Sequence, residues 1–175
     1  MNFAVDNPAP APKPVPDGRA EMQEIADMML TRALLGAERI DSDGIKDTKG
    51  RIAVRIERVF QSTNALYIYY TVRNLTDWPY RIVAPAVSEL IVSQPAISVV
   101  GLKHTQLTQQ TVHRLGDLKR RTVAVARSAV SQSDLQPGEE SQGILVIREQ
   151  VATPTVLQLA FGPERKHPVE AVLVF

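Results

Sequence analysis

The sequence predicts a mainly β protein: a sandwich or barrel of seven to eight short strands, preceded by one helix and a proline-rich arm. Three observations predict this class. After residue 50, apolar residues alternate with polar ones, turn-forming residues separate the alternating runs, and no helical pattern recurs between them. The chain has 175 residues, of which 44% are hydrophobic and 22% are charged. These values suit one globular domain with a buried core.

Residues 1–18 form the predicted arm. The stretch NPAPAPKPVPDG, residues 7–18, contains five of the twelve prolines. Proline fixes φ and has no backbone donor, so this stretch favours an extended, semi-rigid tether. A disordered tail and a spacer to an upstream segment are equally compatible with this composition.

An amphipathic helix is predicted over residues 19–40. Its apolar stripe has helical spacing and comprises Met22, Ile25, Ala26, Met29, Leu30, Ala33 and Leu34. Asp17 is suited to cap its start, and Gly36 suits its end, although the pattern extends a little further. The stripe packs either on its own domain or in the groove of a partner. Because methionine adapts to varied surfaces, Met22 and Met29 are candidate partner contacts.

A β domain is predicted over residues 50–175. Strands are expected at 51–60, 66–74, 87–92, 120–130, 142–149, 155–162 and 168–175, with an edge element at most at 80–85. A short helix is expected near 105–115, within an otherwise irregular segment. In the second strand, alternation directs Tyr70 inwards and directs Tyr67 and Tyr69 outwards.

The segment YIYYTVRNLTDWPYRI, residues 67–82, contains all four tyrosines and the only tryptophan. Either a binding surface or a packed interior would explain this concentration. Alternation splits the cluster and leaves Tyr67 and Tyr69 on an exposed sheet face, where a partner could lie. Trp78 precedes Pro79 in a turn, where we expect it to cover one end of the domain, with its indole N–H on a backbone acceptor. Tyr67, Tyr69 and Trp78 are therefore candidate partner contacts.

No catalytic residue, metal site or cofactor is predicted. The chain has no cysteine, and its three histidines, His104, His113 and His167, show neither metal-ligand spacing nor an adjacent acidic cluster. We expect all three on the surface. No nucleophile-elbow, phosphate-loop or dinucleotide-binding motif occurs. Since an active site needs several polar groups placed together, we expect a protein that is not an enzyme.

The segment 101–128 is basic. Its six lysines and arginines are Lys103, Arg114, Lys119, Arg120, Arg121 and Arg127; with one acid, Asp117, they give a local charge of +5 in a chain of net charge +1. Lys119, Arg120 and Arg121 are therefore candidates for binding an acidic protein, an anionic ligand or nucleic acid. The segment has no aromatic residue for base stacking, which argues against nucleic acid. Alternatively, these charges only prevent a strand edge from pairing with other chains.

The sequence leaves the compartment open. No apolar run reaches the roughly 20 residues that span a bilayer, and the first residues lack the basic and apolar parts of a signal peptide. We expect the periplasm or cell envelope if an upstream signal has been removed, and the cytoplasm otherwise. Other proteins are the expected partners, and homo-oligomers are compatible with the sequence.

Two motifs resemble those of bacterial immunoglobulin-like accessory domains: the strand and N-x-T turn of YIYYTVRNLTDWPYRI, and the later DLQPGEESQGILVI. In the first, Asn74 can hydrogen-bond its own turn; in the second, Pro137 and Gly138 set a tight corner. The resemblance covers residues 50–175. It implies an immunoglobulin-like β-sandwich in a structural or adaptor protein of a cell-envelope assembly, as in conjugative-transfer and secretion machines. The alternatives are a phage capsid or tail protein and an anion-binding module that uses residues 103–127.

Overall fold

The computed structural model describes residues 36–164 and 167–175. The predicted arm, residues 1–18, lies outside this range, as does most of the predicted helix with Met22 and Met29. Within the described part the chain is mainly β, as predicted, and no helix there is long and apolar enough to cross a membrane.

The end of the predicted helix is a strand. Glu38–Arg39 form β1, which pairs with Val59 and Arg58 of the following strand. The prediction of a helix up to residue 40 is therefore wrong at this end. Local apolar spacing indicates a helix here, but backbone pairing of Glu38 with Val59 and of Arg39 with Arg58 overrides it.

Two five-stranded antiparallel sheets make up the β domain. Sheet A contains, in order, β1 (Glu38–Arg39), β2 (Ile52–Gln61), β3 (Leu66–Asn74), β10 (Glu140–Ile147) and β8 (Val125–Val130). Sheet B contains β6 (Thr105–Leu107), β12 (His167–Val174), β11 (Val156–Glu164), β5 (Ala86–Ser93) and β7 (Asp117–Val123). The remaining elements are the paired strands β4 (Tyr80–Arg81) and β9 (Asp134–Leu135) and the short helices η1 (Val100–Leu102) and α2 (Gln109–His113). Eight of these strands have six residues or more, in agreement with the predicted seven to eight.

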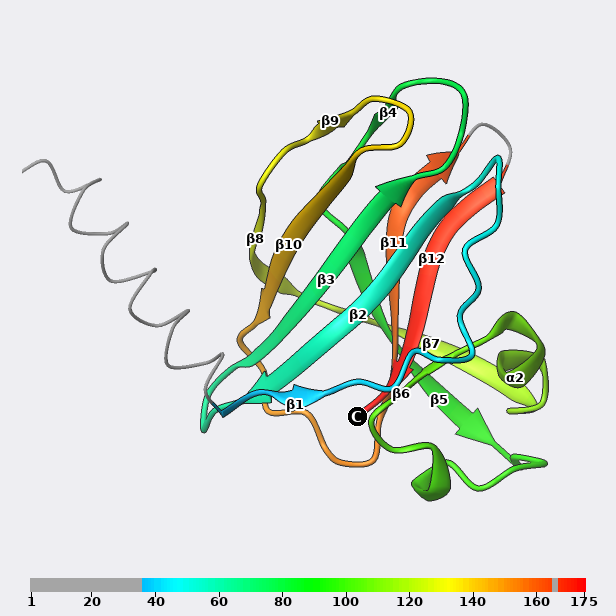
Figure 1. Cartoon of the computed structure of the whole chain (residues 1–175). Coiled ribbons are helices and arrows are strands. Elements are labelled where there is room, and N and C mark those ends of the chain that lie inside the picture. Colours follow the sequence, from blue (N-terminus) through cyan, green and yellow to red (C-terminus); the bar gives the residue numbers. More distant parts are fainter. Residues whose placement is uncertain (1–35, 165–166) are drawn as a thin grey trace, which may run out of the picture. The chain divides into compact units, whose positions relative to one another are not determined.

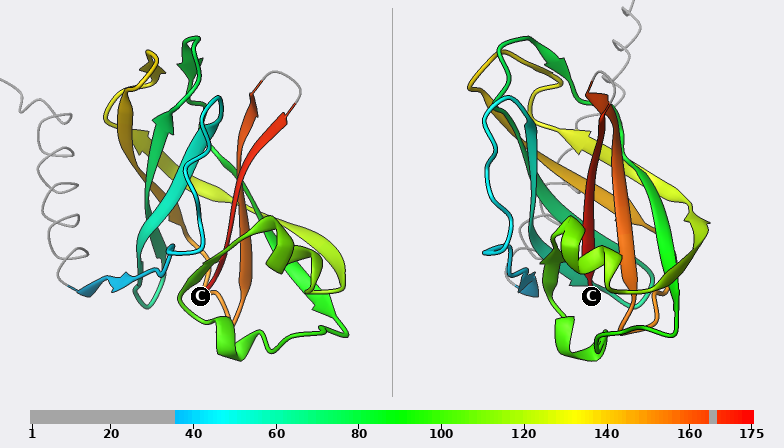
Figure 2. Two further views of the ribbon diagram at one scale, coloured as in Figure 1. Left: turned by 45° about the vertical axis from the view of Figure 1, so that its right-hand side comes forward. Right: turned by 90° about the vertical axis from the view of Figure 1, so that its right-hand side faces the viewer.

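The two sheets face each other across one core (Figures 1 and 2). The order β2-β3-β10-β8 opposite β12-β11-β5-β7 is that of strands A-B-E-D and G-F-C-C′ in immunoglobulin-like sandwiches. The single strand predicted at 120–130 is divided between the sheets. Ala124 alone separates β7, at the edge of sheet B, from β8, at the edge of sheet A. One continuous segment, residues 117–130, therefore supplies an edge strand to each of the two sheets.

The main core lies between the sheets. The predicted alternation in β3 is confirmed, since its buried apolar residues are Leu66, Ile68, Tyr70 and Val72. The ring of Tyr70, from sheet A, lies 4.9 Å from the ring of Phe161, from sheet B. Gly143 of β10 pairs with Tyr70, and a Cβ at Gly143 would lie 2.3 Å from the Tyr70 Cζ. A glycine is required at this position because only its bare backbone leaves space for the ring.

The segment between β5 and β7 covers the outer face of sheet B. Together they form a second core, whose buried members are Leu90, Leu107, Leu115, Val156, Val172 and Val174. The short helix expected near 105–115 is confirmed as α2; its cap Thr108 accepts the Thr111 N–H at 3.2 Å. The strands β11 and β12 of sheet B are thus buried on both faces, whereas no second apolar cluster covers sheet A within the described residues.

Candidate partner-binding surfaces

The outer face of sheet A carries the aromatic patch, which comprises Phe60, Tyr67, Tyr69, Ile144 and Val146. Strand register arranges these side chains in two rows across the sheet. Phe60, Tyr67 and Val146 form one row, and Tyr69 and Ile144 form the next. Opposite side chains on neighbouring strands lie about 5 Å apart, so the five residues make one continuous surface. All five are half-buried.

Tyr67 and Tyr69 point outwards from β3, as predicted, but neither is fully exposed. Because β3 lies inside sheet A, residues of β2 and β10 flank both rings, and the ring of Phe60 lies 5.8 Å from that of Tyr67. The Tyr69 hydroxyl is buried without a hydrogen-bond partner among the described residues. Burial raises the pKa of Tyr69 above its ordinary value, and the neighbouring Tyr67 raises it further. The patch is therefore partly desolvated. The prediction that Tyr67 and Tyr69 lie on an exposed sheet face is corrected: both side chains face outwards, but they are half-buried.

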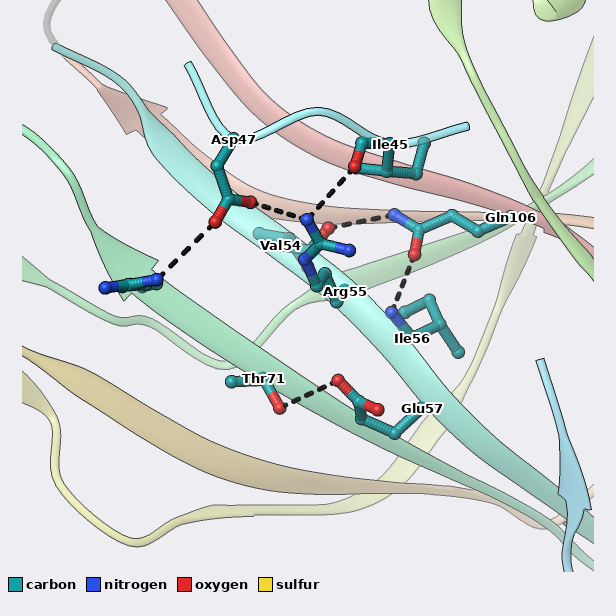
Figure 3. A network of polar contacts seen from close by, with 9 residues as sticks. Ile45, Asp47, Val54, Arg55, Ile56, Glu57, Thr71 and Gln106 are labelled. Carbon is teal, nitrogen blue, oxygen red and sulfur yellow. Dashed lines mark hydrogen bonds and ion pairs between the residues drawn. The ribbon is translucent and has the colours of Figure 1, made fainter. Parts of the chain in front are cut away.

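The other half of the same sheet face is polar (Figure 3). Arg55 on β2 donates to the Ile45 carbonyl at 3.0 Å and to the Asp47 carboxylate at 2.8 Å. Thr71 on β3 donates to the Glu57 carboxylate at 3.3 Å. These polar groups hydrogen-bond to one another within the chain. The aromatic patch is therefore bordered on this side by polar side chains that already have partners.

Trp78 lies half-buried in the turn after β3. The amide nitrogen of Asn74 organises this turn by donating to the carbonyls of Trp78, at 2.8 Å, and Leu135, at 3.1 Å. The Asn74 Oδ1 accepts the backbone N–H and the hydroxyl of Thr76 at 3.0 and 2.6 Å. Asn74 is fully buried, and its carbonyl accepts the Gly138 N–H at 2.8 Å. The predicted role of Asn74 is confirmed, and Trp78 belongs to this corner and not to the aromatic patch.

The three basic candidates lie on β7, at the edge of sheet B. Lys119 and Arg120 are exposed and form no ion pair with a described residue. Arg121 instead binds the carboxylates of Glu89 and Glu149, each at 2.7 Å. The hydrogen bond from the Arg121 guanidinium lowers the pKa of Glu89. Arg121 therefore ties β7 to its own domain, which leaves Lys119 and Arg120 as the basic side chains of β7 that are open to a partner.

The opposite side of the sandwich is closed by a side chain (Figure 3). Gln106, on β6 of sheet B, donates to the Val54 carbonyl at 2.9 Å and accepts the Ile56 N–H at 2.7 Å. Its amide thus pairs with the edge of β2 as another strand would. Next to it, the Ile40 N–H donates to the Glu57 carbonyl at 3.1 Å. These contacts seal the β2 edge of sheet A.

A hollow of about 470 Å³ lies beside β1 and β6. Its lining is polar and of mixed charge: Arg39, Ile40, Asp41, Ser42, Asp43, Glu57, Lys103, His104 and Thr105. His104 is half-buried at the surface, where it lines this hollow, and its Nε2 lies 2.5 Å from the Glu38 carboxylate. Nowhere in the described part do three His, Asp or Glu side chains gather as metal ligands.

Sequence reasoning missed three members of the aromatic patch: Phe60, Ile144 and Val146. Ile144 and Val146 lie at outward positions of a predicted strand, so alternation gives their side of the sheet. Phe60 differs: strict alternation from Val54 and Ile56 directs it inwards, and a bulge between Ile56 and Arg58 turns it outwards. Only the pairing of β2, β3 and β10 brings these three residues beside Tyr67 and Tyr69. Sequence reasoning also missed Gln106, because nothing marks a single glutamine in a polar segment as the partner of a distant strand.

Comparison with known proteins gives only distant structural likeness. No protein-family model matches the chain, and no curated protein matches it. The archaellum periplasmic stator protein FlaG from Sulfolobus acidocaldarius is similar over 70% of this chain and 100% of its own, with 11% identity and a TM-score of 0.38. A structure of the archaellum periplasmic stator complex of FlaF and FlaG from the same organism is similar over 78% of this chain and 98% of its own, with 10% identity and a TM-score of 0.39. At these values we draw the functional argument from the chain's own surfaces.

Proposed function

We propose that this chain is a non-catalytic structural or adaptor domain that binds other proteins in a cell-envelope assembly of the secretion or conjugation type. The aromatic patch carries the proposal. Tyrosine and phenylalanine are enriched in protein interfaces, since their rigid rings supply a large contact area at little cost in conformational entropy. The sequence motifs around Asn74 and Gly138 support the envelope setting.

The surroundings of the patch indicate the chemistry of its partner. Register places Arg58 beside Tyr69 at the end of one row, and Arg127 beside Val146 at the end of the other. A partner that matches this arrangement presents an apolar stripe with acidic residues on its flanks. A hot spot of this kind is a buried aromatic centre inside a charged rim.

Site-specific photo-crosslinking from position 144 in native envelopes tests the proposal. The crosslinked protein is purified, and its affinity for the full chain is then measured. We expect Tyr67→Ala/Tyr69→Ala to weaken this binding at least about tenfold, because truncating central aromatic residues removes most of the contact energy. The matched control is Thr71→Ala/Gln142→Ala, a cross-strand pair on the polar half of the same face, which should bind within about twofold of the wild type.

Two outcomes contradict the proposal. If Tyr67→Ala/Tyr69→Ala lowers the free energy of unfolding but leaves partner binding intact, the patch is structural. If the purified chain forms large symmetric particles by light scattering, a phage capsid or tail protein is the better assignment.

A further inference from the structure

Strand β7 forms one edge of sheet B and has no second neighbouring strand among residues 36–164 and 167–175. It pairs with β5 on one side only, through seven consecutive residue pairs from Asp117 to Val123 with no register shift. On the other side, alternate residues direct their backbone N–H and C=O groups away from β5. None of these groups is hydrogen-bonded to a described residue. The edge is therefore a ready template for one more strand.

The edge of β2, on the other side of the sandwich, differs from the edge of β7. There, Gln106 and the segment around Ile40 occupy the backbone groups of β2. No described segment covers β7 in this way, and β7 contains neither a proline nor a bulge, which are further devices that protect an edge. In the part of the chain that the structure describes, the protection left to this edge is the pair of exposed cations, Lys119 and Arg120.

Cations protect an edge selectively. A second copy of β7 would bring lysine and arginine opposite lysine and arginine, and like charges on neighbouring strands repel. An acidic strand would be attracted by the same side chains. The edge of β7 thus disfavours its own copies and favours an acidic chain.

We propose that β7 binds an extended, acidic segment of a partner protein by β-augmentation. Lys119 and Arg120 are consecutive, so their side chains lie on opposite faces of sheet B, next to Ile91 and Leu90 respectively. Two adjacent acidic residues in the added strand would reach one cation each. The matching segment therefore contains an acidic pair between β-branched residues. This site lies on the other sheet from the aromatic patch and does not depend on it.

The test uses the full chain and the fluorescein-labelled peptide Thr-Val-Glu-Glu-Val-Thr at low salt, with binding followed by fluorescence polarisation and by backbone amide exchange. Two further peptides separate charge from strand pairing: one has Lys-Lys in place of Glu-Glu, and one is N-methylated at alternate backbone nitrogens. The protein variants are Lys119→Glu/Arg120→Glu and a control with the same change in net charge at the exposed turn before β2, Lys46→Glu/Lys49→Glu.

We expect the acidic peptide to bind and to slow amide exchange in β7. The Lys-Lys peptide, the N-methylated peptide and the Lys119→Glu/Arg120→Glu protein should each bind at least about tenfold more weakly, and the control protein within about twofold of wild type. Equal binding of the N-methylated peptide would reduce the site to a general anion-binding surface and overturn the proposal. No exchange protection at about 1 mM peptide, or displacement of the peptide by a single-stranded oligonucleotide at lower concentration, would also overturn it. Tyr67→Ala/Tyr69→Ala should leave peptide binding unchanged, so failure here is distinguishable from failure of the proposed function.

Discussion

The ring of Tyr70 meets the ring of Phe161 edge to face, with 4.9 Å between the centroids and 68° between the planes. Tyr70 lies on β3 of sheet A, and Phe161 lies on β11 of sheet B, so this contact joins the two sheets through the core. The Tyr70 ring covers Gly143 of the neighbouring strand. Packing at the centre of the sandwich therefore depends on the ring of Tyr70 and on the lack of a side chain at Gly143.

Gly143→Ala should destabilise the domain by about 2–3 kcal/mol, because the added Cβ collides with the Tyr70 ring in a close-packed core. Chemical denaturation measures this change. In a Tyr70→Leu background the same substitution should cost clearly less, since the colliding ring is gone. Equal costs in the two backgrounds would show that the glycine serves the backbone and not the ring.

Tyr70→Phe should alter the response of stability to alkaline pH. The Tyr70 hydroxyl is buried, and burial raises its pKa above the ordinary value of about 10, an effect that the Ser128 hydroxyl partly offsets. Above pH 10 the unfolded chain therefore loses this proton more readily than the folded one, and stability falls as pH rises. Below pH 10 both states keep the proton, and the substitution should change the free energy of unfolding by less than about 0.5 kcal/mol.

Urea denaturation at pH 8 and pH 10.5 checks this prediction. The loss of stability between the two pH values should be smaller for Tyr70→Phe than for the wild type. Identical losses would mean that the Tyr70 hydroxyl ionises equally easily in both states.

Asn74→Ala should cost about 2–4 kcal/mol, because it leaves the buried carbonyl of Leu135 and the N–H of Thr76 without their partner. Thermal unfolding measures the loss. Asn64→Ala is the matched control: Asn64 is exposed in the turn between β2 and β3, and its replacement should be nearly neutral. A similar effect of both substitutions would count against Asn74 as the organiser of its corner.

Gln106→Leu should cost about 2–3 kcal/mol and free the edge of β2. Leucine has a similar volume but cannot replace the two hydrogen bonds to Val54 and Ile56. Amide exchange should accelerate at Ile56, and the variant should self-associate more at high concentration. Gln142→Leu, at an exposed position of β10, should leave exchange at Ile56 unchanged. Unaltered exchange in Gln106→Leu would show that the edge is sealed by other contacts.

Much of the fold follows from patterns that are local in the chain. Alternation in β3 is dictated by strand geometry, so the inward direction of Tyr70 and the outward direction of Tyr67 and Tyr69 are predictable. The turn at Asn74 is equally local, because its side chain bonds a residue two positions away. By contrast, local spacing at Glu38–Arg39 indicates a helix and is overruled by pairing with β2.

By itself, the sequence determined the mainly β class, the inward and outward faces of β3 and the corner at Asn74, because each depends on neighbours in the chain. Only the tertiary structure decided which surfaces meet. It placed Ile144 and Val146 beside two tyrosines, set Gln106 on β2 across fifty residues of chain, and divided one predicted strand between two sheets at Ala124. The reason is physical: strand order and register are fixed by burying both sheets against a common core. That constraint acts between residues far apart in the chain, and local periodicity in the sequence does not reveal such pairs.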